Sequence, residues 1–186
     1  NHLVYDDCTL CRFDAHMGFA NATIRNSTLG HQGINAIGSG TFTVENSTIY
    51  GRNLISLRSD YGSTWQGELL IRNCVFVPAG GRATSASLIG GSYSGQHDFG
   101  YTCYMPERIT IENLRIDDSK HPDDYKGPAI FADFNREMTN DSYVEKFPYV
   151  RTREVILRNV TIASGKALRL SDNPFMFKDV KVNSDH

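Results

Sequence analysis

Six polar residues that could do acid–base or ionic chemistry recur in three similar stretches near the start of the chain. The stretches are RFDAHMG (12–18), GINAIG (33–38) and LISLRSDYG (54–62), and in each the apolar residues alternate with polar ones. Because alternate side chains of a strand point to opposite faces, the polar residues point outward if the apolar ones fill the core. The outward set is Asp14, His16, Asn35, Ser56, Arg58 and Asp60.

This set has the chemistry of a polysaccharide site if the three stretches stack as neighbouring strands, within about 10–15 Å of one another. Asp14 and Asp60 could be the acid and base of an inverting glycosidase, whose carboxyl groups lie ~6.5–9.5 Å apart. Alternatively, Arg58 could neutralise a substrate carboxylate while His16 takes the neighbouring proton, as β-elimination requires. The candidate catalytic residues are Asp14, His16, Arg58 and Asp60, with Asn35 and Ser56 as candidate substrate-binding residues.

Arg58 carries two interpretations. Its planar fork could bind a uronate or sialate carboxylate through two hydrogen bonds. In that case Arg58→Ala should remove glycan binding and leave the melting temperature within a few degrees. Alternatively, it is a surface arginine paired with Asp60 or Asp14, contributing at most ~1 kcal/mol. The whole face could also bind glycan without cleaving it, as in an adhesin, or belong to a spacer in a fibre.

Three long insertions are rich in aromatic residues and favour a site on the same face. Residues 60–67, 78–108 and 118–154 are too long for simple turns, and long loops in compact domains are usually functional or disordered. Their rings could stack on sugars, although packing of the loops would also explain them. The stretch GQHDFGYTCYMP (95–106) could hold either a catalytic or a supporting His–Asp pair. The further candidate substrate-binding residues are Tyr61, Trp65, His97, Asp98 and Tyr101.

A repeated motif predicts how these stretches are positioned. TIRNSTLGH (23–31) and TVENSTIYG (43–51) are nearly the same sequence, and related copies follow along the chain. Each copy has an Asn or Asp anchor, with apolar residues two positions before it and three after it. The anchors are Asp7, Asn26, Asn46, Asn73, Asn113, Asn159 and Asp179, spaced by 19, 20, 27, 40, 46 and 20 residues. The motif therefore predicts a strand unit of about twenty residues, repeated seven times with insertions.

The residue before each anchor indicates that the units stack in parallel. These residues are Asp6, Arg25, Glu45, Arg72, Glu112, Arg158 and Lys178, whose charges alternate except at the end. Parallel strands in register would place nearly every charge beside an opposite one, each pair contributing ~0.2–1 kcal/mol. We therefore expect three strands per unit where insertions allow, few helices, and Asn26, Asn46 and Asn73 stacked as neighbours at a turn.

The repeat resembles the right-handed parallel β-helix superfamily of pectate lyases, polygalacturonases and phage tailspike depolymerases, along essentially the whole chain. The resemblance implies an all-β, single-stranded solenoid of about seven coils with long loop insertions, and an extracellular or virion location. It also implies a lyase, a glycosidase or a glycan-binding module. The polygalacturonase signature of N-x-D followed by D-D and G-H-G is not recognisable here, so no family catalytic residue is transferred. A shared fold does not by itself define a function.

The chain ends and the composition complete the expectations. We expect one domain over residues 1–186, cut from a longer chain, because NHLVYDDC runs straight into a strand pattern. Flanking sequence or a homo-oligomeric partner would then cap the solenoid ends. The sequence has no stretch of eighteen apolar residues, so it predicts no membrane span. The net charge of −2 without a basic stripe argues against nucleic acid.

No cofactor is expected. The pair Cys8 and Cys11 has no matching second pair, so zinc is not indicated. Ca²⁺ could bind, but no motif indicates it.

Overall fold

The computed structural model describes the chain in seven ranges. These are residues 1–16, 18–58, 64–78, 85–91, 103–132, 149–172 and 177–185. Within these ranges every regular element is a β-strand, which confirms the predicted all-β class. No helix in the described ranges has the length and apolarity to cross a bilayer.

The larger sheet has the strand order β1-β4-β7-β10-β13-β16-β17, with short strands β2, β5 and β8 continuing it, and all of its pairs are parallel. Its strands are β1 (Leu3–Asp6), β2 (Thr9–Leu10), β4 (Phe19–Arg25), β5 (Thr28–Leu29), β7 (Gly38–Glu45), β8 (Thr48–Gly51), β10 (Trp65–Pro78), β13 (Arg108–Ile116), β16 (Glu154–Ile162) and β17 (Lys181–Asp185).

A second parallel sheet has the order β3-β6-β9-β11-β14, and a small third sheet pairs β12 with β15. The strands are β3 (Phe13–Asp14), β6 (Ile34–Ala36), β9 (Asn53–Leu57), β11 (Ser87–Gly90), β12 (Cys103–Tyr104), β14 (Ala129–Phe131) and β15 (Tyr149–Val150). The chain visits the larger sheet and then the second sheet in each of the first five units. The first three units have the three strands that the repeat predicts.

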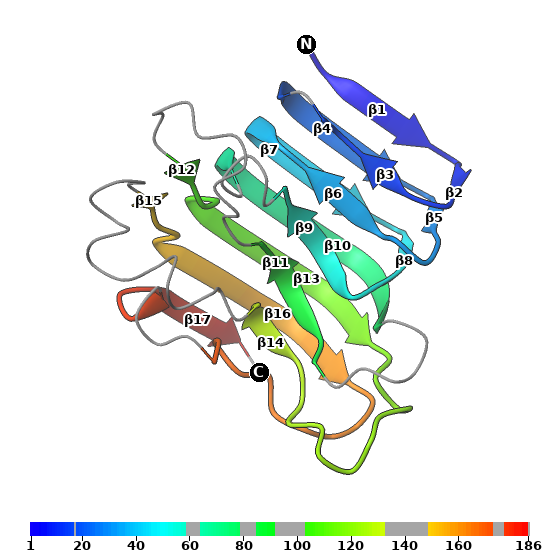
Figure 1. Cartoon of the computed structure of the whole chain (residues 1–186), viewed down its shortest axis with the longest axis vertical. Coiled ribbons are helices and arrows are strands. Elements are labelled where there is room, and N and C mark those ends of the chain that lie inside the picture. Colours follow the sequence, from blue (N-terminus) through cyan, green and yellow to red (C-terminus); the bar gives the residue numbers. More distant parts are fainter. Residues whose placement is uncertain are drawn as a thin grey trace.

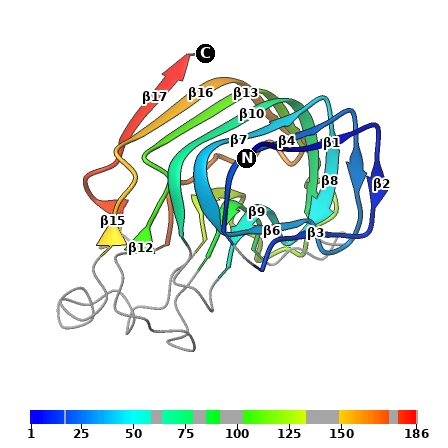
Figure 2. The ribbon, with the colours of Figure 1, turned by 90° about the horizontal axis from the view of Figure 1, so that it is seen from above.

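The strands of the larger sheet lie side by side from the N-terminal to the C-terminal end of the molecule (Figure 1). Seen from above, the two large sheets enclose a common interior (Figure 2). Each of the first five units adds to both sheets, so a residue in one unit lies beside its counterpart in the next.

The core is built from the two apolar columns that flank the anchors. The column two residues before the anchor includes Ile24, Val44, Ile71 and Ile111, and the column three residues after it includes Leu29, Ile49, Phe76 and Ile116; all eight are fully buried. They pair in register, Ile24 beside Val44 and Ile71 beside Ile111. Burying such a side chain contributes about 1.5–3 kcal/mol, which makes these columns the main stabilising feature of the units.

The anchors form the predicted ladder at the turn after each long strand. The anchors from Asp7 to Asn159 have φ between 49° and 55°, the left-handed region that Asn and Asp tolerate best among non-glycine residues. The amide of Asn46 donates to Asn26 at 3.3 Å, and the amide of Asn73 donates to Asn46 at 3.2 Å. Asn113 and Asn159 continue the ladder at 2.9 Å each. The expected stacking of Asn26, Asn46 and Asn73 is confirmed.

The seventh unit is placed differently from the prediction. Strand β17 pairs Asp185 with Arg158 and Val182 with Val155, so Asp179 is not the equivalent of the earlier anchors. The stretch MFKDVKV imitates the alternation of the motif, but the strand begins only at Lys181. Val182, expected in the core, is 40% exposed. The residue that follows Arg158 in the charge column is therefore Asp185 rather than Lys178.

With this correction the charge column alternates without exception. In register it reads Asp6, Arg25, Glu45, Arg72, Glu112, Arg158 and Asp185. Arg25 lies 2.7 Å from Asp6, Arg72 lies 2.6 Å from Glu45, and Arg158 pairs with Glu112. The hydrogen bond from Arg25 lowers the pKa of Asp6, and the same bond raises the pKa of Arg25.

Candidate functional site

A groove of about 670 Å³ runs over the second sheet and crosses six successive units. One lining residue from each unit, in order, is Arg12, Asn35, Ser56, Ser87, Ala129 and Arg169. Arg169 belongs to this series because it forms an isolated parallel β-bridge with Ala129 of β14, and so takes the next position after β14 in the stack. At ~4.8 Å per strand, the groove extends about 24 Å along the stack.

Asp14, at the end of β3, is the centre of a polar cluster at one end of the groove. Arg58 donates from Nη1 to Asp14 Oδ1 at 2.8 Å, and Asn35 donates from Nδ2 to the same oxygen at 3.1 Å. Arg12 pairs with Asp14 Oδ2. The parallel pairing of Asp14 with Asn35 and of Asn35 with Ser56 brings these groups together from three units. The predicted clustering of Asp14, Asn35, Ser56 and Arg58 on one face is observed, and their roles remain predictions.

The ion pair between Arg58 and Asp14 is nearly buried, contrary to the expectation of an exposed arginine. The Arg58 side chain is 9% exposed and that of Asp14 is 12% exposed. Removing one partner of a buried pair costs ~3–5 kcal/mol when the other charge is left alone. Asp14 would keep Arg12 and Asn35, so the cost here is smaller, but Arg58→Ala cannot be assumed to leave the melting temperature unchanged. Loss of binding by that variant alone would not distinguish contact from scaffold.

A second row of residues continues the groove toward the C-terminal units. Asn53, Ser87, Ala129 and Arg169 lie in register across four units. Ser87 donates to Asn53 Oδ1 at 2.5 Å, and Asn53 donates to Ser56 Oγ at 2.9 Å. Gly90 leaves room for this arrangement, since a Cβ there would lie 2.1 Å from Asn53 Nδ2. The described residues in the middle of the groove are thus uncharged, and most of them are small.

Positive charge exceeds negative charge along the groove. Four arginines line it, namely Arg12, Arg52, Arg58 and Arg169. Asp172 also lines it, and Asp14 pairs with two of the arginines, so the described charges leave an excess of two positive charges. Arg52 is exposed, and no hydrogen bond or ion pair to it is found in the described part of the chain. In a protein with net charge −2, this local excess favours an anionic ligand.

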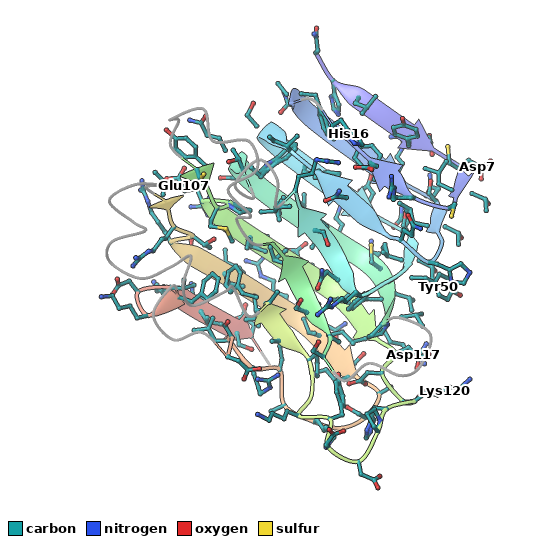
Figure 3. All side chains as sticks on the ribbon, in the orientation of Figure 1. Asp7, His16, Tyr50, Glu107, Asp117 and Lys120 are labelled. Atoms are coloured by element: carbon teal, nitrogen blue, oxygen red, sulfur yellow. The ribbon has the colours of Figure 1, made fainter. Side chains whose placement is uncertain are left out.

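The other predicted site residues fall into three groups. His16 is 67% exposed, and its Nδ1 lies 3.8 Å from Asp14 Oδ2. It lies just beyond the end of β3, on the side of the N-terminal strands away from Asp7 (Figure 3). Trp65, expected to bind substrate, is instead fully buried in the core. The candidates outside the described residues are Asp60, Tyr61, His97, Asp98 and Tyr101.

The burial of Trp65 has a clear physical reason. Its indole lies 5.1 Å from the Phe42 ring and 5.5 Å from the Phe19 ring, and its Nε1 donates to the Gly40 carbonyl at 3.0 Å. Gly38 makes the space, because a Cβ there would lie 2.7 Å from the indole. Trp65 therefore contributes to the core, and the prediction that it binds substrate is wrong.

No cysteine is among the described residues that line the groove. All four cysteines are free, and Cys74 is buried, which raises its pKa to about 11. Among the described residues, no group of three or more His, Cys, Asp or Glu side chains could hold a metal ion.

The groove also contains polar residues that were not predicted from the sequence, among them Arg12, Arg52, Asn53, Ser87 and Arg169. Arg12 is the first residue of RFDAHMG and Arg52 lies two residues before LISLRSDYG, so charge next to the outward positions was the available signal. Ser87 and Arg169 follow insertions, where the repeat gave no alignment of the second strand.

The chain matches no family model, no curated protein and no solved structure.

Proposed function

We propose that the chain is a right-handed parallel β-helix that binds an acidic polysaccharide in the groove over its second sheet and cleaves it. The observation that carries the proposal is that four arginines line a groove about five strand spacings long. The alternation between two parallel sheets supports the β-helix. The right-handed sense rests on the rule that parallel crossover connections are right-handed in nearly all proteins.

Between the two cleavage reactions, the described residues support β-elimination better than hydrolysis. Hydrolysis needs two carboxyl groups ~6.5–9.5 Å apart, one of them able to give a proton. Asp14 already accepts from Arg12, Arg58 and Asn35, and Asp60 lies outside the described residues. In β-elimination, a guanidinium neutralises the uronate carboxylate while a base takes the adjacent proton. The glycosidic oxygen then leaves with its electron pair, and a carbon–carbon double bond forms.

His16 is the candidate base in this reaction. It is exposed and lies beside the Asp14 cluster. Arg52 and Arg12, which are more exposed than Arg58, are the candidate groups for holding the carboxylate.

A non-catalytic glycan binder is the second candidate, favoured by the saturation of Asp14. A carboxylate with three donors on its two oxygens serves to fix Arg12 and Arg58 rather than to move a proton. The same groove would then hold the polysaccharide without cleaving it.

One experiment tests the proposal and separates the two candidates. Binding to polygalacturonate, alginate and heparin is measured by calorimetry at low salt, with neutral dextran as the control polysaccharide. Cleavage is followed by the absorbance of unsaturated uronate and by new reducing ends. Arg52→Ala should weaken binding, and Arg115→Ala should not, because Arg115 is 57% exposed and pairs with Asp117 outside the groove. Binding without either product signal supports the non-catalytic candidate. Absence of binding to all three polyanions would refute the proposed function.

A further inference from the structure

Arg169 occupies the far end of the groove and is not part of the Asp14 cluster. It lies in register with Ala129, Ser87 and Asn53, three strand spacings or about 14 Å from the unit that carries Arg52 and Arg58. The described lining residues between are uncharged, and most of them are small, although Phe131 is among them. The groove therefore has arginines at two separate places, and the described lining residues between them are neutral.

The guanidinium of Arg169 is held in place and is still accessible. Its Nη2 donates to the Gly127 carbonyl at 3.2 Å, and its Nη1 pairs with Asp172. Its Nε is buried and has no hydrogen-bond partner within the described ranges. The side chain is nevertheless 26% exposed and lines the groove. A fixed, partly desolvated guanidinium interacts with an anion more strongly than a mobile surface one does.

We infer that Arg169 forms a second anion subsite, so that the groove holds an acidic oligosaccharide lengthwise with acidic groups at both ends. The inference rests on the proposed function and specifies its ligand. The preferred ligand carries carboxylate or sulfate groups on sugars that are not adjacent, about 14 Å apart, with neutral sugar surface over Ser87 and Ala129. A chain too short to reach Arg169 gains nothing from it.

The length dependence of binding tests this inference. Acidic oligosaccharides from disaccharide to octasaccharide, prepared from the polysaccharide that binds best, are titrated into the intact chain. Affinity should rise with length until the oligosaccharide spans both subsites and then level off. Arg169→Gln should weaken the long oligosaccharides about tenfold, the effect of losing one charge-assisted hydrogen bond, and leave the short ones unchanged.

A second variant guards against misfolding of the first. Asp172 is 49% exposed and competes with the ligand for Arg169, so Asp172→Asn should tighten the binding of long oligosaccharides only. Arg115→Gln is the charge-matched control and should change neither. The inference fails if Arg169→Gln weakens all lengths equally or none, or if Asp172→Asn has no length-dependent effect. If the wild-type chain binds no acidic oligosaccharide of any length, the proposed function itself fails.

Discussion

At the scale of single residues, Asp118 is a buried carboxylate that lies outside the groove and is held by three hydrogen bonds. It is 2% exposed and accepts hydrogen bonds from Tyr125 Oη at 2.8 Å, from the Ser164 amide at 2.8 Å and from Ser164 Oγ at 2.7 Å. These bonds join the turn after β13 to the turn after β16. A buried carboxylate is tolerated when its oxygens are satisfied in this way, so the cluster fixes two loops that belong to neighbouring units.

The same cluster predicts a loss of stability in alkali. Desolvation and, secondly, the hydrogen bond to Asp118 raise the pKa of Tyr125 above its ordinary value. The folded state therefore binds the phenolic proton more tightly than the unfolded state, and this stability is fully present below the ordinary tyrosine pKa of about 10. It is lost as the pH rises from there through the higher folded-state value. We expect about 1 kcal/mol of the free energy of unfolding to disappear by about pH 11.

Tyr125→Phe checks this expectation. Its free energy of unfolding, measured by urea denaturation, should fall less between neutral pH and about pH 11 than that of the wild type. Tyr50→Phe, at an exposed tyrosine, is the control and should follow the wild-type pH dependence. Parallel curves for the wild type and Tyr125→Phe would mean that Tyr125 does not contribute to the alkaline loss.

At the scale of elements, the turn after each long strand combines a backbone requirement with a side-chain ladder. The anchors need φ near 50°, which costs most non-glycine residues about 1–2 kcal/mol. Each inner anchor also gives one amide hydrogen bond to the unit before it and accepts one from the unit after it. Asparagine meets both needs, which explains why it recurs as the anchor although the insertions between the anchors differ greatly in length.

Substitutions at Asn73 separate the two contributions. Asn73→Ala loses the bonds to Asn46 and Asn113 and is strained at φ 53°, so it should lower the free energy of unfolding by about 2–3 kcal/mol. Asn73→Gly loses the same bonds without the strain and should cost about 1 kcal/mol less. Urea denaturation measures both. Asn183→Ala, which loses a bond to Glu154 in an ordinary strand, is the control. Equal losses for Ala and Gly would exclude a backbone contribution.

At the scale of the whole molecule, the sequence predicts what repeats and not what interrupts the repeat. The anchors, the apolar columns and the parallel register could be predicted because each unit carries the same local pattern. The seventh unit was misplaced because MFKDVKV satisfies that pattern, whereas the strand begins only at Lys181. Trp65 was misassigned because the space beneath Gly38 is a tertiary feature. The far end of the groove at Arg169 depends on how a 46-residue spacing closes, which no local pattern specifies.

The charge column runs through all seven units of the larger sheet. Each charge lies one strand spacing, about 4.8 Å, from an opposite charge in the neighbouring unit. If one unit were skipped in the stacking order, charges of the same sign would lie side by side. If a strand slipped by one residue against its neighbour, its core residues would point outward. The column therefore favours the observed order of units as well as adding a small stabilisation.

Reversing one charge in the middle of the column tests this role. Glu112 lies between Arg72 and Arg158 in register and pairs with Arg158. Glu112→Gln removes the attraction, whereas Glu112→Arg also places three positive charges on consecutive strands. Glu112→Arg should therefore be less stable than Glu112→Gln by about 0.3–1 kcal/mol in dilute buffer. The difference should shrink in 1 M salt, where the screening length is about 3 Å and shorter than the strand spacing. Urea denaturation at both salt concentrations measures it, and a difference that salt leaves unchanged would point to altered packing instead of charge.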